Sequence, residues 1–206
     1  MMKKNNQFLL LVFLSILIGF LTIACAQKPY ININYRPLAP PDNFKNKNIY
    51  LDVKDARSDT AIFSKTAKPE LENFTNLFAL SLQKDKKDGV IVGVFGVLPL
   101  FKEAFSKRLE NMGMNILTDY KETEPSIEIV LEKFLLDLVN RKWVVEISYE
   151  AIMKKENNVI FKESISGKAE RVKVFAQKDA EKALSEIFTS LVNKLDIMKL
   201  VMQDKP

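Results

Sequence analysis

Apolar and polar residues alternate along much of the chain, and this alternation predicts β-strands. In the run 142–154 every second position is apolar, and the shared face carries Trp143, Val145, Ile147, Tyr149, Ala151 and Met153. A period of two places such side chains on one side of a strand. Polar turns at Asn140-Arg141 and Asn157-Asn158 connect this run to the runs 127–139 and 159–172. The pattern therefore predicts three long strands in an antiparallel meander.

Shorter runs predict further strands on the N-terminal side of the meander. They cover 49–54, 76–82, 90–97 and 114–118, and a charged turn separates 76–82 from 90–97. The stretch 31–35 also alternates, so part of it is expected to add an edge strand.

Two segments instead have the apolar spacing of helices. The first follows Pro99, a residue suited to a first helical turn, and stops at Gly113. The second runs from about Gln177 to Met202, and its apolar stripe is expected to pack on a sheet. The predicted fold class is α+β, a two-layer sandwich of a mainly antiparallel sheet with two principal helices on one face.

The N-terminus has the layout of a secretory signal, with Lys3 and Lys4 before the apolar run 8–23. Three outcomes compete. Ala24 before Cys25 resembles a lipobox, although Thr22 replaces its usual Leu. Cleavage after Ala26 would instead release a soluble protein, and an uncleaved segment would be long enough to span a membrane.

Lipidation of Cys25 is the preferred outcome, because the chain has one cysteine and it lies at the end of the apolar run. Several acyl chains, palmitate among them, would anchor the protein stably. Ala26 stands where an Asp would signal inner-membrane retention, so we expect the outer membrane, on its periplasmic face. The domains are then a lipoprotein signal peptide at 1–24, a lipidated Pro-rich tether at 25–48 and one α+β domain at 49–206.

Composition argues against an enzyme. The chain has no histidine, which removes the usual general base and the commonest metal ligand. One cysteine excludes an intrachain disulfide or a thiolate zinc cage. We expect no cofactor and no metal. The 31 basic and 26 acidic residues are spread evenly, unlike a nucleic-acid footprint, so no nucleic-acid partner is expected.

Several of these features together resemble the YajG-like bacterial lipoproteins. They are the lipobox, the pattern Ile33-Asn34-Tyr35-Arg36-Pro37, a first strand running into Asp55-Ala56-Arg57, and the order helix, meander, C-terminal helix. The resemblance implies a small envelope lipoprotein without an assigned enzymatic activity.

Three acidic residues and one arginine gather where the first strand of the domain ends. Asp52, Asp55 and Asp59 could bind a hard cation through oxygen, but they lack the spacing of a calcium loop. A turn in which Asp55 or Asp59 caps backbone amides and pairs with Arg57 is favoured. Because the resemblance includes Asp55 and Arg57, we expect a structural pairing there, with Asp55, Arg57 and Asp59 as structural or interaction candidates.

Two other stretches offer weaker candidates. Glycines at 89, 93 and 96 interrupt an apolar run, which we expect to be a buried strand; an exposed apolar hairpin touching a membrane or partner is the alternative. Glu146, Ser148 and Glu150 share a strand face and favour a solvated surface over a glycosidase pair.

The function expected from these observations is that of a lipid-anchored, non-enzymatic binding or accessory module of the cell envelope. Its partners would be the membrane, through Cys25, and an envelope protein. The alternative is a periplasmic carrier or sensor of an apolar ligand such as a lipid, held between the helices and the sheet. That alternative rests on the apolar run 89–101.

Overall fold

The computed structural model describes residues 29–38, 44–83 and 89–197. Its elements in chain order are β1 (Tyr30–Tyr35), β2 (Asn48–Asp55), the short 3-10 helix η2 (Lys68–Leu71), β3 (Leu77–Leu82), β4 (Val90–Phe95), α2 (Val97–Asn111), β5 (Asn115–Leu117), β6 (Ser126–Val139), β7 (Lys142–Lys155), β8 (Asn158–Val172) and α3 (Ala176–Lys194). The α+β class is confirmed, with one difference of detail. The described strands form two mixed sheets rather than one mainly antiparallel sheet.

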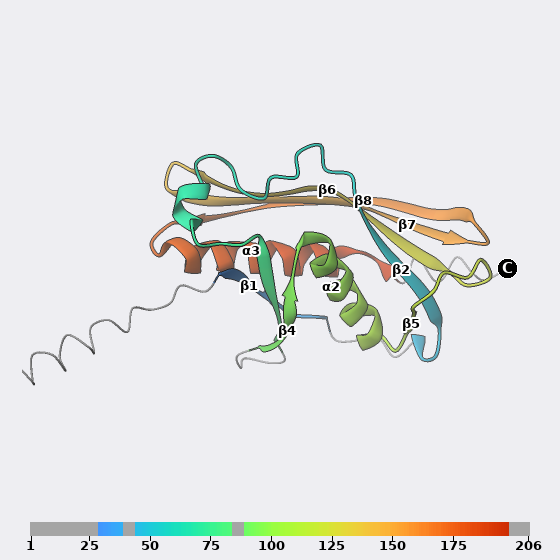
Figure 1. The fold of residues 1–206 in the computed structure, drawn as a ribbon. Helices are drawn as coiled ribbons and strands as arrows, with labels where there is room; N and C mark the ends of the chain where they lie inside the picture. Colours follow the sequence, from blue (N-terminus) through green and yellow to red (C-terminus); the bar gives the residue numbers. More distant parts are fainter. Residues whose placement is uncertain (1–28, 39–43, 84–88, 198–206) are drawn as a thin grey trace, which may run out of the picture.

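The larger sheet has five strands in the order β5-β2-β6-β7-β8, and both helices lie on one of its faces (Figure 1). The predicted meander is present, because β7 pairs antiparallel with β6 and with β8. The run of alternating apolar residues in β7 is buried beneath the helices, as expected. By contrast, β2 runs parallel to both of its neighbours.

Two-residue turns join the long strands. Asn140 and Arg141 form the first turn, and Glu156 and Asn157 form the second; all four have positive φ angles. Turns of this kind match the right-handed twist of a hairpin. The second turn lies one residue earlier than the pair Asn157-Asn158 indicated.

The smaller sheet has the order β1-β3-β4, and β1 is an edge strand, as predicted for this stretch. β1 runs parallel to β3 and contributes Ile31, Ile33 and Tyr35, which are fully buried. The fold therefore uses part of the segment 25–48 that the sequence indicates as a tether.

A row of polar side chains on α3 covers the outer edge of β1. Glu181 Oε1 accepts the backbone N–H of Asn32 at 3.0 Å, and Ser185 Oγ accepts that of Asn34 at 3.0 Å. The row consists of Gln177, Glu181, Ser185, Thr189 and Asn193, each of which bonds to the backbone of β1 or of Arg36 after it. Residues four apart share one helix face, so the row follows the strand. The side chains replace the hydrogen bonds that a further strand would make.

The end of α3 is held by α2. Arg108 is buried, and its guanidinium donates to the carbonyl oxygens of Val192 and, at 2.6 Å, Leu195. Val192 lies in the last turn of α3, where backbone carbonyls lack a partner within the helix. The carbonyl oxygen of Leu195, just after the helix, also accepts the N–H of Ile197 at 3.1 Å. α3 ends at Lys194, since Leu195 has an extended ψ of 120°. The end near Met202 that the sequence predicts lies outside the described residues.

Candidate functional site

The predicted attachment point, Cys25, lies outside the described residues, but Pro29, four residues later, is held in place. The carbonyl oxygen of Pro29 accepts two hydrogen bonds from Thr75, from its N–H at 2.9 Å and its hydroxyl at 2.7 Å. Four residues span at most about 14 Å. Any lipid on Cys25 would therefore enter the membrane close to the start of β1.

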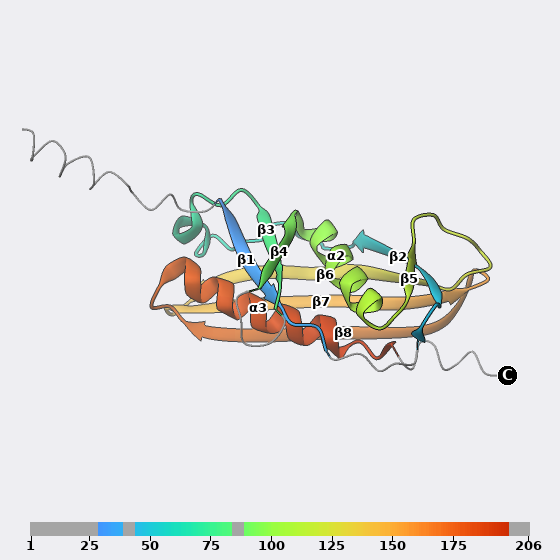
Figure 2. The same ribbon diagram turned by 90° about the horizontal axis from the view of Figure 1, so that it is seen from below.

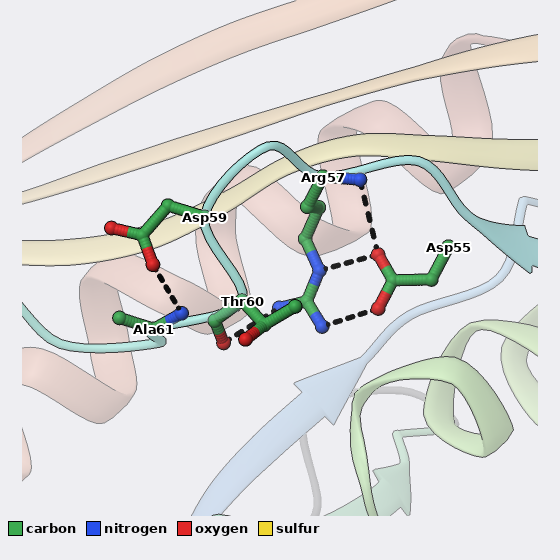
Figure 3. Close-up of polar contacts among 5 residues, drawn as sticks. All are labelled: Asp55, Arg57, Asp59, Thr60 and Ala61. Carbon is green, nitrogen blue, oxygen red and sulfur yellow. Dashed lines mark hydrogen bonds and ion pairs between the residues drawn. The ribbon is translucent and has the colours of Figure 1, made fainter.

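The structure brings Asp55 and Arg57 together in a bidentate ion pair (Figure 3). Nε and Nη2 of Arg57 each donate to one oxygen of Asp55 at 2.8 Å. The hydrogen bonds from Arg57 lower the pKa of the Asp55 carboxyl. The Arg57 side chain is only 7% exposed, so the pair is more rigid than an ordinary surface contact.

Asp59 does not join this pair. Its carboxylate faces away from Arg57 and accepts the backbone N–H of Ala61 at 2.8 Å (Figure 3). Asp52 instead accepts the N–H of Val53. Within the described residues no group of three or more Cys, Asp and Glu side chains converges as metal ligands would. The three aspartate carboxylates instead make separate contacts, each within its own stretch of chain.

These contacts shape a loop that interrupts the pairing of two strands. Asp55 pairs with Leu131 of β6, and the chain returns to β6 only at Phe63, opposite Leu136. Between these points, Nη1 of Arg57 donates to the carbonyl oxygen of Thr60 at 3.4 Å. Arg57 and Asp59 therefore fix the loop whose last residues are Thr60 and Ala61.

The end of this loop forms one wall of a groove of about 690 Å³, a volume typical of small-molecule sites. Apolar side chains supply much of its lining, namely Ala61, Ile62, Phe63, Pro69, Leu71 and Phe74. Lys65 and Lys68 also line it. Phe74 meets the ring of Phe63 edge-on at 4.9 Å and connects the groove to the core.

Sequence reasoning missed this groove because residues 60–73, which supply most of its lining, have no clear period. The expected location of an apolar ligand, between the helices and the larger sheet, is instead filled by aromatic rings. The ring centroid of Phe101 lies 5.1 Å from that of Phe188, 5.9 Å from that of Phe134 and 6.3 Å from that of Tyr149. Ser64 and Thr66 both donate to Asp137 of β6 and tie the groove to the sheet, through contacts that the sequence does not indicate.

The apolar strand β4 differs most from the expectation. Its predicted burial is wrong, since Val90 is 75% exposed, Ile91 51% and Val94 44%. β4 pairs with β3 on one side only. Gly93 does allow a close approach, in this case of the Phe95 ring, because a Cβ at position 93 would lie 2.5 Å from Cζ of Phe95. The alternative of an exposed apolar hairpin matches this structure better.

The carboxylates of β7 lie on the open face of the larger sheet. Glu146 forms an ion pair with Lys133, and Glu150 forms one with Lys162 at 2.9 Å. Charged side chains from three strands thus pair across this face, as cross-strand neighbours do. The two carboxylates stand in a row and do not face each other across a cleft.

Within the described part of the chain, we find no helix with the length and apolar character needed to cross a membrane.

Comparison of sequences gave no match to a protein-family model or to a curated protein. Comparison of structures gave several similar folds. A Xanthomonas campestris protein of the family DUF330 has a TM-score of 0.50 and 11% identity, covering 85% of this chain and 96% of that one. Rare lipoprotein B of Shewanella oneidensis has a TM-score of 0.39 and 9% identity, covering 75% and 96%. Lipoprotein GNA1162 of Neisseria meningitidis has a TM-score of 0.30 and 12% identity, covering 72% and 97%. At 11% identity the likeness to the DUF330 protein concerns the fold alone.

Proposed function

We propose that this protein is a lipid-anchored accessory protein of the bacterial cell envelope, without enzymatic activity, that binds a protein partner along the open edge of β4. Cys25 would carry the lipid, and the domain would face the periplasm from the outer membrane. The YajG-like resemblance belongs to this proposal. The occurrence of similar folds among bacterial lipoproteins supports it.

The observation that carries the proposal is that the edge strands β1 and β8 are covered or charged, whereas the edge strand β4 is neither. An open strand edge pairs readily with another chain, so soluble proteins cover or charge their edges. The polar row of α3 covers β1, and the long edge strand β8 carries Lys162, Lys168 and Glu170 among other charges. β4 has the sequence VIVGVF, without a charge, and no described strand lies beyond it. Such an edge suits an extended, uncharged segment of a partner.

The anchor is tested by the mass of the mature N-terminus and by fractionation of the cell. We expect acylated Cys25 as the first residue, in the outer membrane, and release of a Cys25→Ser variant from that fraction. An unmodified terminus at Gln27 would contradict the anchor.

The partner surface is tested by a photoreactive residue at Val90, in intact cells, with a matched probe at Ser166 on the open face of the larger sheet. We expect one reproducible crosslinked envelope protein from position 90 and none from position 166. Ile91→Lys should abolish the crosslink and Val159→Lys should not, because Val159 is equally exposed but lies on β8. Equal labelling from both probes, or indifference to Ile91→Lys, would contradict strand addition at β4.

The groove supports a second candidate, a carrier or sensor of a single acyl chain. Its apolar lining and volume are the supporting observations. Native mass spectrometry of the protein taken from membranes should show one bound lipid. Ala61→Trp would fill the groove and displace the lipid, whereas Ala56→Trp, on the same loop but outside the lining, would leave it bound. A protein free of lipid, or lipid retained by Ala61→Trp, would exclude this candidate.

A further inference from the structure

Four exposed apolar side chains lie at the end of the molecule where β1 begins. Val174 is 70% exposed, Phe175 66%, Val172 60% and Val139 45%. Val139 is the last residue of β6 and Val172 the last of β8, and the other two lie in the connection between β8 and α3. We call this group, with the neighbouring cations Arg141, Lys142, Arg171, Lys173 and Lys178, the anchor-end surface.

Hydrogen bonds show that these segments are neighbours. The N–H of Lys173 donates to the carbonyl oxygen of Arg141 at 2.9 Å, which joins the two parts of the surface. Gln177 Nε2 donates to the carbonyl oxygen of Tyr30 at 3.3 Å, which joins them to the start of β1. Figures 1 and 2 both show β1 and α3 beginning at this end of the molecule.

The exposed side chains are held by a fixed backbone. Asp179 Oδ2 accepts the N–H groups of Val174 at 2.8 Å and Phe175 at 2.6 Å. Its carboxylate thus closes the first turn of α3 and leaves both side chains outside. A surface that is already ordered loses little conformational entropy on contact.

Charge distinguishes this surface from an ordinary apolar patch. The stretch from Arg171 to Lys178 interleaves cations with apolar residues and contains no acid. The acids nearest to it form ion pairs with its cations: Glu70 with Lys173, Glu170 with Lys142, and Asp179 and Glu186 with Arg171. Cations flanking exposed apolar groups suit the interface of a membrane that contains anionic lipids.

The position of the anchor indicates the occupant of this surface. Cys25 lies four residues before Pro29, so its Cα is within about 14 Å of Pro29, the residue before β1. We propose that the anchor-end surface docks on the bilayer, with Phe175 and the valines in the headgroup region and the cations against anionic headgroups. This inference rests on the proposed lipid anchor and adds an orientation to it: the β7–β8 turn points away from the membrane.

The chain offers a matched test on a single strand. Once Cys25 is acylated, an introduced cysteine is the only free thiol, so Val174→Cys and Val159→Cys can each be labelled with a fluorophore. The two valines have similar exposure. Val159 lies at the start of β8, and Val174 lies two residues after its end. The labelled lipoproteins are placed in vesicles of phosphatidylethanolamine and phosphatidylglycerol that carry a shallow nitroxide-labelled lipid. We expect several-fold stronger quenching at position 174. Equal quenching, or stronger quenching at 159, would overturn the orientation.

Failure of the anchor would be seen separately, as protein that does not sediment with membranes and begins at Gln27. That soluble protein would then be mixed with phosphatidylglycerol vesicles. The anchor-end surface predicts binding that Val174→Glu weakens about fivefold or more and that Val159→Glu leaves unchanged. Absence of binding, or equal losses in both variants, would overturn the surface itself.

Discussion

Arg108 provides the sharpest test of how the two helices are held together. Its guanidinium is buried and donates to the carbonyl oxygens of Val192, in the last turn of α3, and of Leu195, just after it. In Arg108→Ala both carbonyls lose a charged donor, and the side-chain volume is left empty. Arg108→Met keeps most of the volume but removes the donor, so the two variants separate packing from hydrogen bonding.

The expected magnitude follows from two charge-assisted hydrogen bonds. Each contributes about 1.5–3 kcal/mol, and part of that sum offsets the burial of the charge. We therefore expect Arg108→Ala to lower the free energy of unfolding by about 3–4 kcal/mol. Arg108→Met should lose about 1–2 kcal/mol less than Arg108→Ala, because it leaves a smaller cavity. For a domain of this size, the loss in Arg108→Ala lowers Tm by about 10 °C.

Urea unfolding followed by circular dichroism measures these differences. Lys107→Ala is the matched control, because Lys107 is the preceding residue of the same helix but forms only partly exposed ion pairs with Glu103 and Glu110. We expect the control to change stability by less than about 1 kcal/mol. If Arg108→Ala behaves like Lys107→Ala, the idea that Arg108 secures the end of α3 is wrong.

Three further predictions concern single contacts. Ser185→Ala removes the acceptor for the Asn34 N–H and should cost about 1 kcal/mol in urea unfolding; no change would show that water replaces the hydroxyl. Gly167→Ala would place a Cβ 2.8 Å from Cδ1 of Ile187, so overpacking should cost about 1–3 kcal/mol by the same assay, and a neutral effect would mean that the Ile187 side chain moves aside. Asp55→Asn should lower stability at pH 7 by about 1 kcal/mol. Because the folded pKa of Asp55 is lowered, its contribution is present above the unfolded pKa of about 3.9 and is lost as the pH falls through the folded value. The difference in Tm between wild type and Asp55→Asn should therefore shrink below about pH 4, and a constant difference would refute the assignment.

The long elements could be predicted because their local patterns agree with their final surroundings. The apolar face of β7 and the apolar stripes of both helices are buried where a single core requires them. Gly113 ends α2 with a φ of +87°, a conformation that glycine adopts without strain. Such signals depend only on residues that are close to one another in sequence, so they can be recognised without the tertiary structure.

The candidate residues were only partly predictable. Asp55 and Arg57 are two positions apart, so their contact is a local event that the sequence could indicate. Their role in shaping the wall of the groove depends on where the chain rejoins β6 at Leu136, a residue about 80 positions away. The groove itself arises from a stretch without periodicity, which left no pattern to read.

The sequence by itself determined the α+β class, the meander, the two helices and the position of a lipidation candidate at Cys25. The tertiary structure alone decided that β1 lies against α3, through side chains about 150 residues away, and that β4 is exposed. An apolar run indicates that a strand avoids water, but what covers it depends on contacts distant in sequence. In β4 the described fold provides no such cover, and this difference between pattern and burial is the reason to look for a partner there.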